Sequence, residues 1–253
     1  PTGALFGVVN MLRAHLKEAP EHIAFVLDAP GRTFRDELYP DYKANRPPMP
    51  DDLRAQLEPL QAIVQALGLP ILRVSGVEAD DVIGTLALQA HARGIDVLVS
   101  TSDKDMAQLV RARDGDGPGI AMINTMSGGR LDSDAAVQAK FGVRADQIVD
   151  YLALVGDAVD NIPGVPKCGP KTAAKWLGEY HTLDGVIAAA ADIKGKIGDN
   201  LRAALDHLPR NRELITLKTD VALEQRPADL ALRERDVEAL RGLYTRYGFN
   251  QAL

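Results

Sequence analysis

Short apolar runs alternate with helix-periodic segments through the first half of the chain, and this alternation restricts the possible folds most. The apolar runs lie at residues 23–27, 71–74, 95–100 and 120–124, and each has the length and flanks of a buried strand. Helical spacing of apolar residues fills the segments 5–16, 51–67, 79–93 and 105–111. The pattern predicts right-handed βαβ units and a mostly parallel central sheet flanked by helices, an α/β fold.

The pattern changes at residue 132. Helices are expected near 132–141, 145–155, 171–177, 200–208 and 235–247, with no convincing strand. The Gly- and Asp-rich stretch 114–119 is expected to be a flexible turn. We therefore expect an α/β domain over residues 1–131 and a helical subdomain over residues 132–253.

Composition excludes several other classes of protein. The chain has 253 residues, of which 46% are hydrophobic and 25% charged, which is ordinary for a folded globular protein and not for a disordered one. No apolar run is long enough to span a membrane, and no signal segment opens the chain. The single cysteine, Cys168, excludes internal disulfides and a Cys-based zinc cluster. A reducing cytoplasmic location is expected.

Acidic residues gather at four places, mostly where strands end. Any one of these acids could simply cap a helix. If all of these carboxylates met at one edge of a sheet, their negative charges would repel one another strongly. Bound divalent cations would remove this repulsion. Oxygen ligands without His or Cys favour Mg²⁺ or Mn²⁺, and two such ions could promote an in-line phosphoryl displacement. The eight candidate ligands are Asp28, Glu78, Asp80, Asp81, Asp103, Asp105, Asp157 and Asp160.

The net charge changes its meaning if these eight acids bind metal. The chain carries 29 basic and 35 acidic residues, a net charge of −6, which taken alone argues against a nucleic-acid partner. Without the eight candidate ligands, 27 acids remain against 29 bases, a balance of +2. The rest of the molecule is then compatible with a polyanion.

Residues 34–46 combine basic and aromatic side chains directly after Asp28. If the segment is helical, five of them lie near one face, although Pro40 favours a kink or a break. The segment is either a solvated loop or a phosphate clamp whose rings stack on unpaired bases. The five side chains are Arg35, Tyr39, Tyr42, Lys43 and Arg46.

Residues 162–173 form a Gly- and Pro-rich connection between two expected helices. The second helix begins near Lys171, where free backbone N–H groups and the helix dipole favour a phosphate. Lys167, Lys171 and Lys175 recur at four-residue intervals. The connection is either an ordinary helix–helix turn or a contact to the DNA backbone that does not read sequence.

Several longer motifs make a family resemblance recognisable. They are the segments 34–38, 46–54, 74–85, 103–109 and 156–165, together with Tyr42-Lys43. On these the chain resembles, over essentially its whole length, the 5′-nuclease domains of bacterial DNA polymerases I in the flap endonuclease superfamily. The resemblance implies a PIN-like or resolvase-like nuclease core followed by a helical subdomain with a helix-hairpin-helix motif.

The resemblance also implies an activity, which is structure-selective 5′→3′ exonuclease and 5′-flap endonuclease hydrolysis of DNA with two Mg²⁺ ions. Such a monomeric enzyme removes primers and flaps in replication and repair. It acts on DNA with 5′ flaps, nicks or RNA primers and precedes a C-terminal polymerase domain.

Residue by residue, the resemblance assigns three groups. Asp28, Glu78, Asp80 and Asp81 match a first metal cluster, and Asp103, Asp105, Asp157 and Asp160 match a second. Arg35, Tyr42, Lys43 and Arg46 match a helical arch near residues 32–50, where Arg35, Lys43 and Arg46 are expected to act on the scissile phosphate and Tyr42 to contact DNA. Residues 164–173, in a hairpin near 150–178, match a motif that binds duplex DNA in the family. The same motif holds K⁺ through backbone carbonyls. The expected DNA contacts are Gly164, Val165, Lys167, Gly169, Lys171, Thr172 and, by its spacing, Lys175.

The chain departs from the family pattern in three ways. The family begins with a strand that ends in a metal-binding aspartate, ahead of the position of Pro1, so the chain is expected to be a fragment. Lys167 stands where many relatives have glycine, and Pro170 follows Gly169. The stretch 114–119 is longer than usual.

Two other functions stay open. Without its first strand the chain could be a non-catalytic module that binds branched DNA. A phosphatase-like hydrolase with an aspartyl nucleophile is the weaker alternative, because Asp28 is followed by Ala-Pro-Gly.

Overall fold

The computed structural model describes residues 2–249, in two compact units. Unit 1 contains residues 2–30, 47–75 and 222–249, and unit 2 contains residues 31–46 and 76–221. Residue 1 and residues 250–253, at the outer ends of the two domains expected from sequence, lie outside the described residues. The domain boundary expected after residue 131 falls inside unit 2 and stays a prediction.

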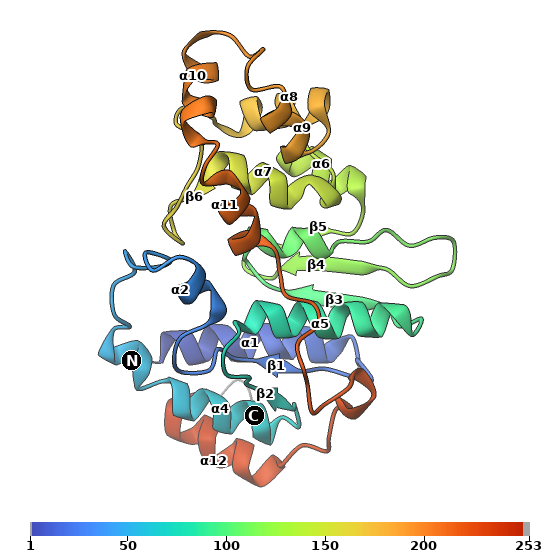
Figure 1. The fold of residues 1–253 in the computed structure, drawn as a ribbon. Helices are drawn as coiled ribbons and strands as arrows, with labels where there is room; N and C mark the ends of the chain where they lie inside the picture. The colour runs from blue at the N-terminus through green and yellow to red at the C-terminus, as the bar shows by residue number, and fades with distance from the viewer. Residues whose placement is uncertain (1, 250–253) are drawn as a thin grey trace. The chain divides into compact units, whose positions relative to one another are not determined.

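Unit 1 is a small α/β unit built from three separate stretches of chain. Strands β1 and β2 pair in parallel, with Phe25 opposite Ile71 and Val26 opposite Leu72. Helices α1 and α12 both contact α4, and Figure 1 shows α4 and α12 side by side. Its elements are α1 (Gly3–Lys17), β1 (Phe25–Val26), α3 (Asp51–Arg54), α4 (Leu57–Ala66), β2 (Ile71–Leu72), the 3-10 helix η3 (Pro227–Asp229) and α12 (Val237–Tyr247).

The core of unit 1 follows from the apolar spacing of its helices. On α1 the buried residues recur every three or four positions, as expected for one helix face, and they join buried residues of α4 and α12 in one cluster. Gly68 ends α4 with φ +88°, and a Cβ there would lie 2.2 Å from the carbonyl oxygen of Arg233. Glycine is therefore required at this turn.

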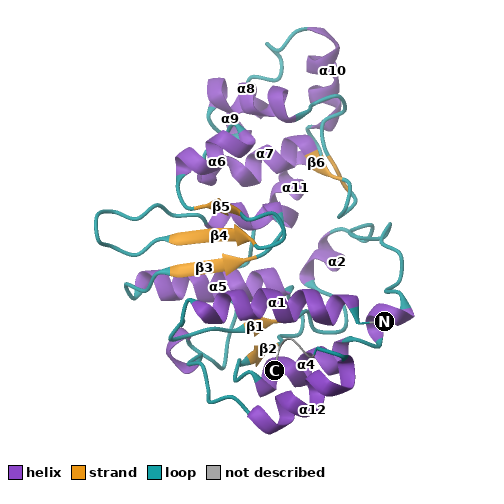
Figure 2. Ribbon diagram, turned by 180° about the vertical axis from the view of Figure 1, so that it is seen from behind, coloured by secondary structure: helices purple, strands orange, loops and turns teal. Residues whose placement is uncertain are grey.

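Unit 2 begins with a three-stranded sheet. Strands β3 and β4 run in parallel, and β5 pairs antiparallel with β4, as Figure 2 shows. Helix α5 and the 3-10 helix η1 pack against the sheet. These elements are α5 (Ala79–Ala92), β3 (Val97–Ser100), η1 (Lys104–Leu109), β4 (Ile120–Asn124) and β5 (Gly129–Leu131).

The rest of unit 2 is mainly helical and shares one core with the sheet. Helix α7 contacts α8, α9, α11 and η1, and four of its eight residues are at most 2% exposed. The remaining elements are α2 (Phe34–Leu38), α6 (Asp134–Phe141), η2 (Ala145–Gln147), α7 (Ile148–Val155), β6 (Gly156–Asp157), β7 (Ile162–Pro163), α8 (Pro170–Tyr180), α9 (Leu183–Ala188), α10 (Gly195–Ala204) and α11 (Leu208–Ile215).

The structure confirms an α/β fold with parallel strand pairs and a helical second half. The expectation that no strand follows residue 132 is wrong, because β6 and β7 form a short antiparallel pair. The helix expected over 51–67 is interrupted at Ala55 and Gln56, where the Gln56 side chain accepts hydrogen bonds from the backbone N–H groups of Ala4 and Leu5. The helix expected over 105–111 is the 3-10 helix η1, which begins one residue earlier and ends two residues earlier. Among residues 2–249 no helix is both long enough and apolar enough to cross a membrane.

Candidate active site

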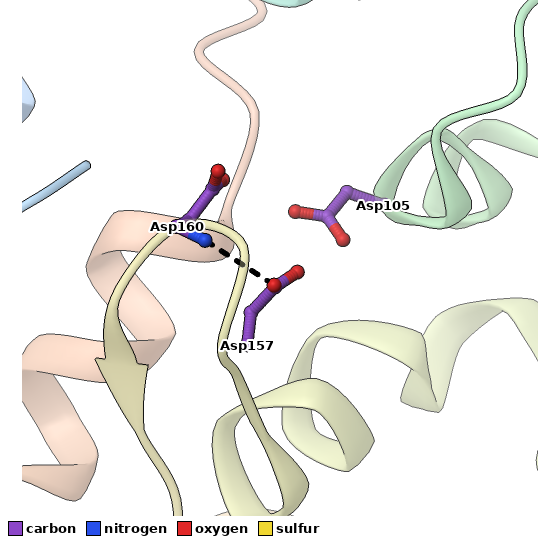
Figure 3. A group of neighbouring side chains, drawn as sticks. All are labelled: Asp105, Asp157 and Asp160. Atoms are coloured by element: carbon purple, nitrogen blue, oxygen red, sulfur yellow. Dashed lines mark hydrogen bonds between the residues drawn. The ribbon is translucent and has the colours of Figure 1, made fainter. Parts of the chain in front are cut away.

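Three aspartates from two distant parts of the sequence meet in unit 2. Asp105 lies on η1, Asp157 ends β6, and Asp160 lies in the turn before β7. Each offers an oxygen atom such that all three oxygens lie within 4.8 Å of one another. Figure 3 shows the Asp105 side chain pointing toward the other two. We call these three residues the aspartate cluster.

Two glycines fix the turn that carries Asp157 and Asp160. Gly156 has φ +80°, and a Cβ on it would lie 2.3 Å from the backbone nitrogen of Gly164. A Cβ on Gly164 would lie 2.3 Å from the carbonyl carbon of Val155. The backbones therefore approach too closely for any side chain, so both positions need glycine.

The side chain of Asp157 orders this turn from within. One of its oxygens, Oδ1, accepts hydrogen bonds from the backbone N–H groups of Val159, at 2.8 Å, and of Asp160, at 3.3 Å. Both aspartates are buried, at 6% and 8% exposure. The turn thus holds two carboxylates in place, and Figure 3 shows the hydrogen bond from the Asp160 N–H to Asp157.

Asp105 is the least compensated member of the cluster. Its Oδ1 is buried and accepts no hydrogen bond from any described residue. Burial first, and then the negative charges of Asp103 and Asp157, raise the pKa of Asp105 to about 8. A buried carboxylate oxygen without a donor, within a group made only of carboxylates, fits a hard divalent cation bound by oxygen.

Three cationic side chains pair with acidic residues, two of them in the aspartate cluster and the third Glu78. Lys104 Nζ is 2.6 Å from Asp157 Oδ2, Lys43 pairs with Glu78, and Arg46 pairs with Asp160. Burial is the largest single influence on Lys104 and would lower its pKa, but the hydrogen bond to Asp157 and the charges of Asp157, Asp105 and Asp103 together raise it. These cations reduce the mutual repulsion of the acids. Sequence reasoning did not single out Lys104; its position between Asp103 and Asp105 was the available signal.

Tyr42 contacts both Glu78 and a member of the aspartate cluster, Asp160. Its hydroxyl lies 3.0 Å from Glu78 Oε2 and 3.4 Å from Asp160 Oδ2. Burial, followed by the charge of Glu78, raises the pKa of Tyr42, so the hydroxyl keeps its proton and donates. Tyr42 as a whole residue is only 6% exposed. In this structure Tyr42 therefore orients carboxylates and does not offer a face for stacking on a base.

The rest of the arch segment is attached to the same turn. The backbone N–H of Lys43 donates to the carbonyl of Asp160 at 2.9 Å, with Lys43 at φ +56°. The Asn45 side chain donates to the carbonyl of Ala158 at 2.7 Å. Between residues 32 and 50 the structure has the short helix α2 and turns at residues 40–45, and the helical arch expected there stays a prediction.

Arg35 and Asp81 form a buried ion pair. Arg35 is 2% exposed and Asp81 is fully buried, and the guanidinium lies 2.7 Å from Asp81 Oδ2 and 2.9 Å from Glu78 Oε2. Burial is the largest single influence and opposes the ionised form of each. The pairing outweighs it together with the charge of Glu78 on Arg35 and with backbone hydrogen bonds from Lys218 and Glu78 to Asp81, so the pKa of Arg35 is raised and that of Asp81 is lowered. Arg35 also donates to the carbonyls of Leu214 and Thr216. This geometry differs from the expectation that Arg35 reaches a substrate phosphate, because its donors are already occupied.

The other candidate ligands lie at element ends. Asp80 is half-buried in the first turn of α5, whose N-terminus Glu78 and Asp81 cap reciprocally. Asp103 is exposed and caps η1 by accepting a hydrogen bond from the Asp105 N–H at 3.0 Å. Asp28 follows β1 in unit 1, whereas the other seven predicted ligands belong to unit 2.

A cavity of about 490 Å³ opens beside the aspartate cluster. Tyr39 and residues 155–158 and 161–164 line it, including Asp157. The Arg210 guanidinium lies 4.0 Å from the centre of the Tyr39 ring, a cation–π contact that positions both side chains. Tyr39 and Arg210 thus add an aromatic ring and a positive charge near a space that reaches a candidate metal ligand.

The hairpin between α7 and α8 forms as expected from sequence. The Val165 N–H donates to the carbonyl of Leu154 at 2.8 Å, and the Cys168 N–H donates to that of Val165. Lys167 adopts φ +67°, and Pro170 occupies the first turn of α8. Cys168 is buried, which raises the pKa of its thiol to about 11. Lys167, Lys171 and Lys175 are exposed and Thr172 is half-buried.

An α/β fold that carries clustered carboxylates, next in sequence to a helical hairpin with exposed lysines, is a class of architecture suited to metal-dependent nucleases. Comparison with known families makes the class specific. The family model described as the N-terminal resolvase-like domain of 5′-3′ exonucleases matches residues 1–142, and that for the C-terminal SAM fold of 5′-3′ exonucleases matches residues 143–238. The chain therefore belongs to the 5′-3′ exonuclease family.

Individual relatives agree with this membership. The chain is 50% identical over 266 residues to DNA polymerase I of Pseudomonas aeruginosa, covering 100% of this chain and 28% of that protein. It is 36% identical over 242 residues to a 5′-3′ exonuclease of Aquifex aeolicus, covering 95% of this chain and 80% of that protein. The chain thus spans just over a quarter of the length of the DNA polymerases I that it matches.

Solved structures share the fold. The T5 5′-exonuclease bound to divalent zinc ions has a TM-score of 0.71 at 21% identity, over 95% of this chain and 89% of that one. The catalytic core of Rad2 in complex with a DNA substrate has a TM-score of 0.56 at 16% identity, over 88% and 74% of the two chains. At these identities the likeness concerns the fold alone.

Proposed function

We propose that this chain is a divalent-metal-dependent 5′ nuclease that hydrolyses DNA phosphodiester bonds at 5′ flaps and nicks. The aspartate cluster carries the proposal, because Asp105 brings a buried oxygen without a donor to two further buried carboxylates. Membership of the 5′-3′ exonuclease family supports the choice of substrate. Two Mg²⁺ ions at these carboxylates and at Glu78 and Asp80 would supply the Lewis acid that activates water and stabilises the leaving oxygen.

The protein side chains have separate tasks in this proposal. Lys43 and Arg46, which now pair with Glu78 and Asp160, are the side chains that hold and neutralise a substrate phosphate. Arg35 is a positioning residue that keeps Asp81 and Glu78 in place from inside the core. Tyr42 holds Glu78 and Asp160 in register. No histidine belongs to the cluster within the described residues, so no imidazole base is assigned.

The direct test is cleavage of a 5′-end-labelled flap duplex by the chain in Mg²⁺ or in EDTA. Asp105→Asn is expected to reduce cleavage at least about 100-fold, because the cluster loses a charged ligand. Binding of the same duplex in EDTA is expected to change less than about twofold. The matched control is Asp116→Asn, in an exposed loop outside the cluster.

The outcomes separate the alternatives. Mg²⁺-dependent release of products at the flap junction supports the nuclease. Tight binding of branched DNA without cleavage at any metal concentration would instead leave a non-catalytic binding module. Equal loss of cleavage in Asp105→Asn and Asp116→Asn would exclude the aspartate cluster as the metal site.

Several finer assignments belong to the same proposal. They are Mg²⁺ as the physiological ion, K⁺ at the hairpin turn between Gly164 and Gly169, and hairpin contacts to duplex DNA. They also include metal binding by Asp28, a helical subdomain that starts at residue 132, a monomeric state and a location in the bacterial cytoplasm. A polymerase domain within the same protein is proposed from the relatives' names.

A further inference from the structure

A second cavity, of about 400 Å³, lies between helices α8 and α10. Most of its lining surface is apolar, and one lining residue is Trp176, which is 4% exposed. None of the described residues that line it is acidic, and none of its three lysines makes an ion pair with another described residue. The lining residues are Lys167, Thr172, Lys175, Trp176, Lys196, Ile197 and Asn200.

The three lysines come from three different elements. Lys167 lies in the hairpin turn, Lys175 on α8, and Lys196 in the first turn of α10. All three are exposed, so their ammonium groups can meet a ligand from solvent. Three like charges around one cavity whose lining includes no acidic residue create a positive potential that favours an anion.

The cavity is held together by polar and steric constraints. The Asn200 side chain donates a hydrogen bond to the carbonyl of Pro166 at 2.8 Å and so connects α10 to the hairpin turn. The next residue, Lys167, has φ +67°, a conformation that this contact helps to maintain. A Cβ on Gly198 would lie 1.9 Å from the carbonyl oxygen of Ile193, so the start of α10 is fixed as well.

We propose that this cavity binds a backbone phosphate of duplex DNA and that α10 is part of the DNA-binding surface. Lys196 is the new contact, and Lys167, Lys175 and the Thr172 hydroxyl complete the anion site. The proposal rests on the proposed nuclease function and extends its substrate contacts by one helix beyond the hairpin. Lysine ammonium groups and a hydroxyl bind phosphate, and none of these groups is assigned to a base edge. We therefore expect a contact that does not depend on DNA sequence.

The test measures duplex binding by fluorescence anisotropy with the full chain in EDTA. Lys196→Glu is expected to weaken binding of a blunt labelled duplex about tenfold, and Lys196→Ala about threefold, while Lys196→Arg stays near wild type. The slope of log K against log salt is expected to decrease by about one for Lys196→Ala. Lys194→Glu and Lys194→Ala are matched controls, because Lys194 is exposed on the same segment and does not line the cavity.

Other outcomes would overturn the proposal. Unchanged duplex affinity in Lys196→Glu, or equal losses in Lys194→Glu and Lys196→Glu, would leave no specific site. Inorganic phosphate provides a second probe: if it binds with a Lys196-dependent affinity in calorimetry while duplex binding does not depend on Lys196, the cavity takes a small free anion and not DNA. Since binding is read without cleavage, a chain that binds the duplex through Lys196 but cuts no flap would contradict only the nuclease proposal.

Discussion

The carboxyl group of Asp105 keeps its proton to a high pH in the metal-free protein. Burial and neighbouring acids raise its pKa to about 8 from the ordinary 3.8. Between these two pH values the native state holds a proton on Asp105 that the unfolded state has lost. The free energy of unfolding therefore has its full value, as far as Asp105 is concerned, below about pH 4 and decreases as the pH rises toward 8. We therefore expect the metal-free wild-type protein to lose stability, relative to Asp105→Asn, between pH 5 and pH 8.

Urea unfolding in EDTA at several pH values measures this difference. Comparison with Asp105→Asn cancels the other titrating groups, including His15, whose pKa burial lowers. A constant difference in unfolding free energy from pH 5 to pH 8 would contradict the raised pKa of Asp105. Saturating Mg²⁺ is expected to abolish the pH dependence of the difference, because a bound cation favours the ionised carboxylate.

Lys104 occupies the position of a competing cation. Its Nζ lies 2.6 Å from Asp157 Oδ2, and its side chain is 41% exposed, so the pairing is partly screened by water. Lys104→Met is expected to tighten Mg²⁺ binding about fivefold, as measured by isothermal titration calorimetry. Lys140→Met, on the exposed surface of α6, is the control and is expected to leave the affinity unchanged. Weaker Mg²⁺ binding in Lys104→Met would show that Lys104 supports the site instead of competing with the ion.

At the scale of elements, the antiparallel pairing of β6 and β7 places two of the three aspartates. A Cβ on Gly164 would lie 2.3 Å from the Val155 carbonyl and 2.5 Å from the Gly156 nitrogen, both of them backbone. Gly164→Ala is therefore expected to destabilise the protein by about 3 kcal/mol and to weaken Mg²⁺ binding. The control is Gly178→Ala, which meets open space inside α8 and is expected to stabilise by about 0.5–1 kcal/mol. Thermal unfolding of both variants measures the contrast, and similar melting temperatures would contradict it.

How far the sequence predicts these elements depends on their length and periodicity. Strand β4, residues 120–124, is predicted with its observed bounds, since a continuous apolar run between turn residues has few alternatives. Strands β6 and β7 have two residues each and show no period, so no pattern in the sequence indicated them. Helix α9, with six residues, was missed for the same reason.

The sequence predicts the acidic residues of the candidate site better than it predicts the contacts of Arg35 and Tyr42. Asp105, Asp157 and Asp160 follow from strand ends and turns, because those positions converge in an α/β fold. The burial of Arg35 and Tyr42 depends on carbonyls and carboxylates that are 36 to 181 residues away in sequence. No local pattern contains such contacts, so charge and aromatic character alone suggested exposed contacts to DNA.

At the scale of the whole molecule, the aspartate cluster belongs entirely to unit 2. Ions that bind only the folded cluster stabilise by mass action, by about 2.7 kcal/mol at a concentration of 100 Kd. We expect saturating Mg²⁺ to slow amide hydrogen exchange in η1 and α7 about 100-fold and to leave α12 of unit 1 nearly unchanged. Asp157→Asn is expected to remove the effect. Equal protection of α7 and α12 would mean that the two units open together.

Unit 1 is assembled from three stretches, and its core joins Leu5 and Val9 of the first helix to Leu240 and Tyr244 of the last. During synthesis on a ribosome, the apolar face of α1 emerges more than two hundred residues before its partners on α12. The long stretch 76–221 of unit 2 leaves the exit tunnel before α12 does, and it can fold while unit 1 is still incomplete. A nascent chain that stalls before α12 is released with exposed leucines, which are the kind of surface that chaperones and proteases recognise.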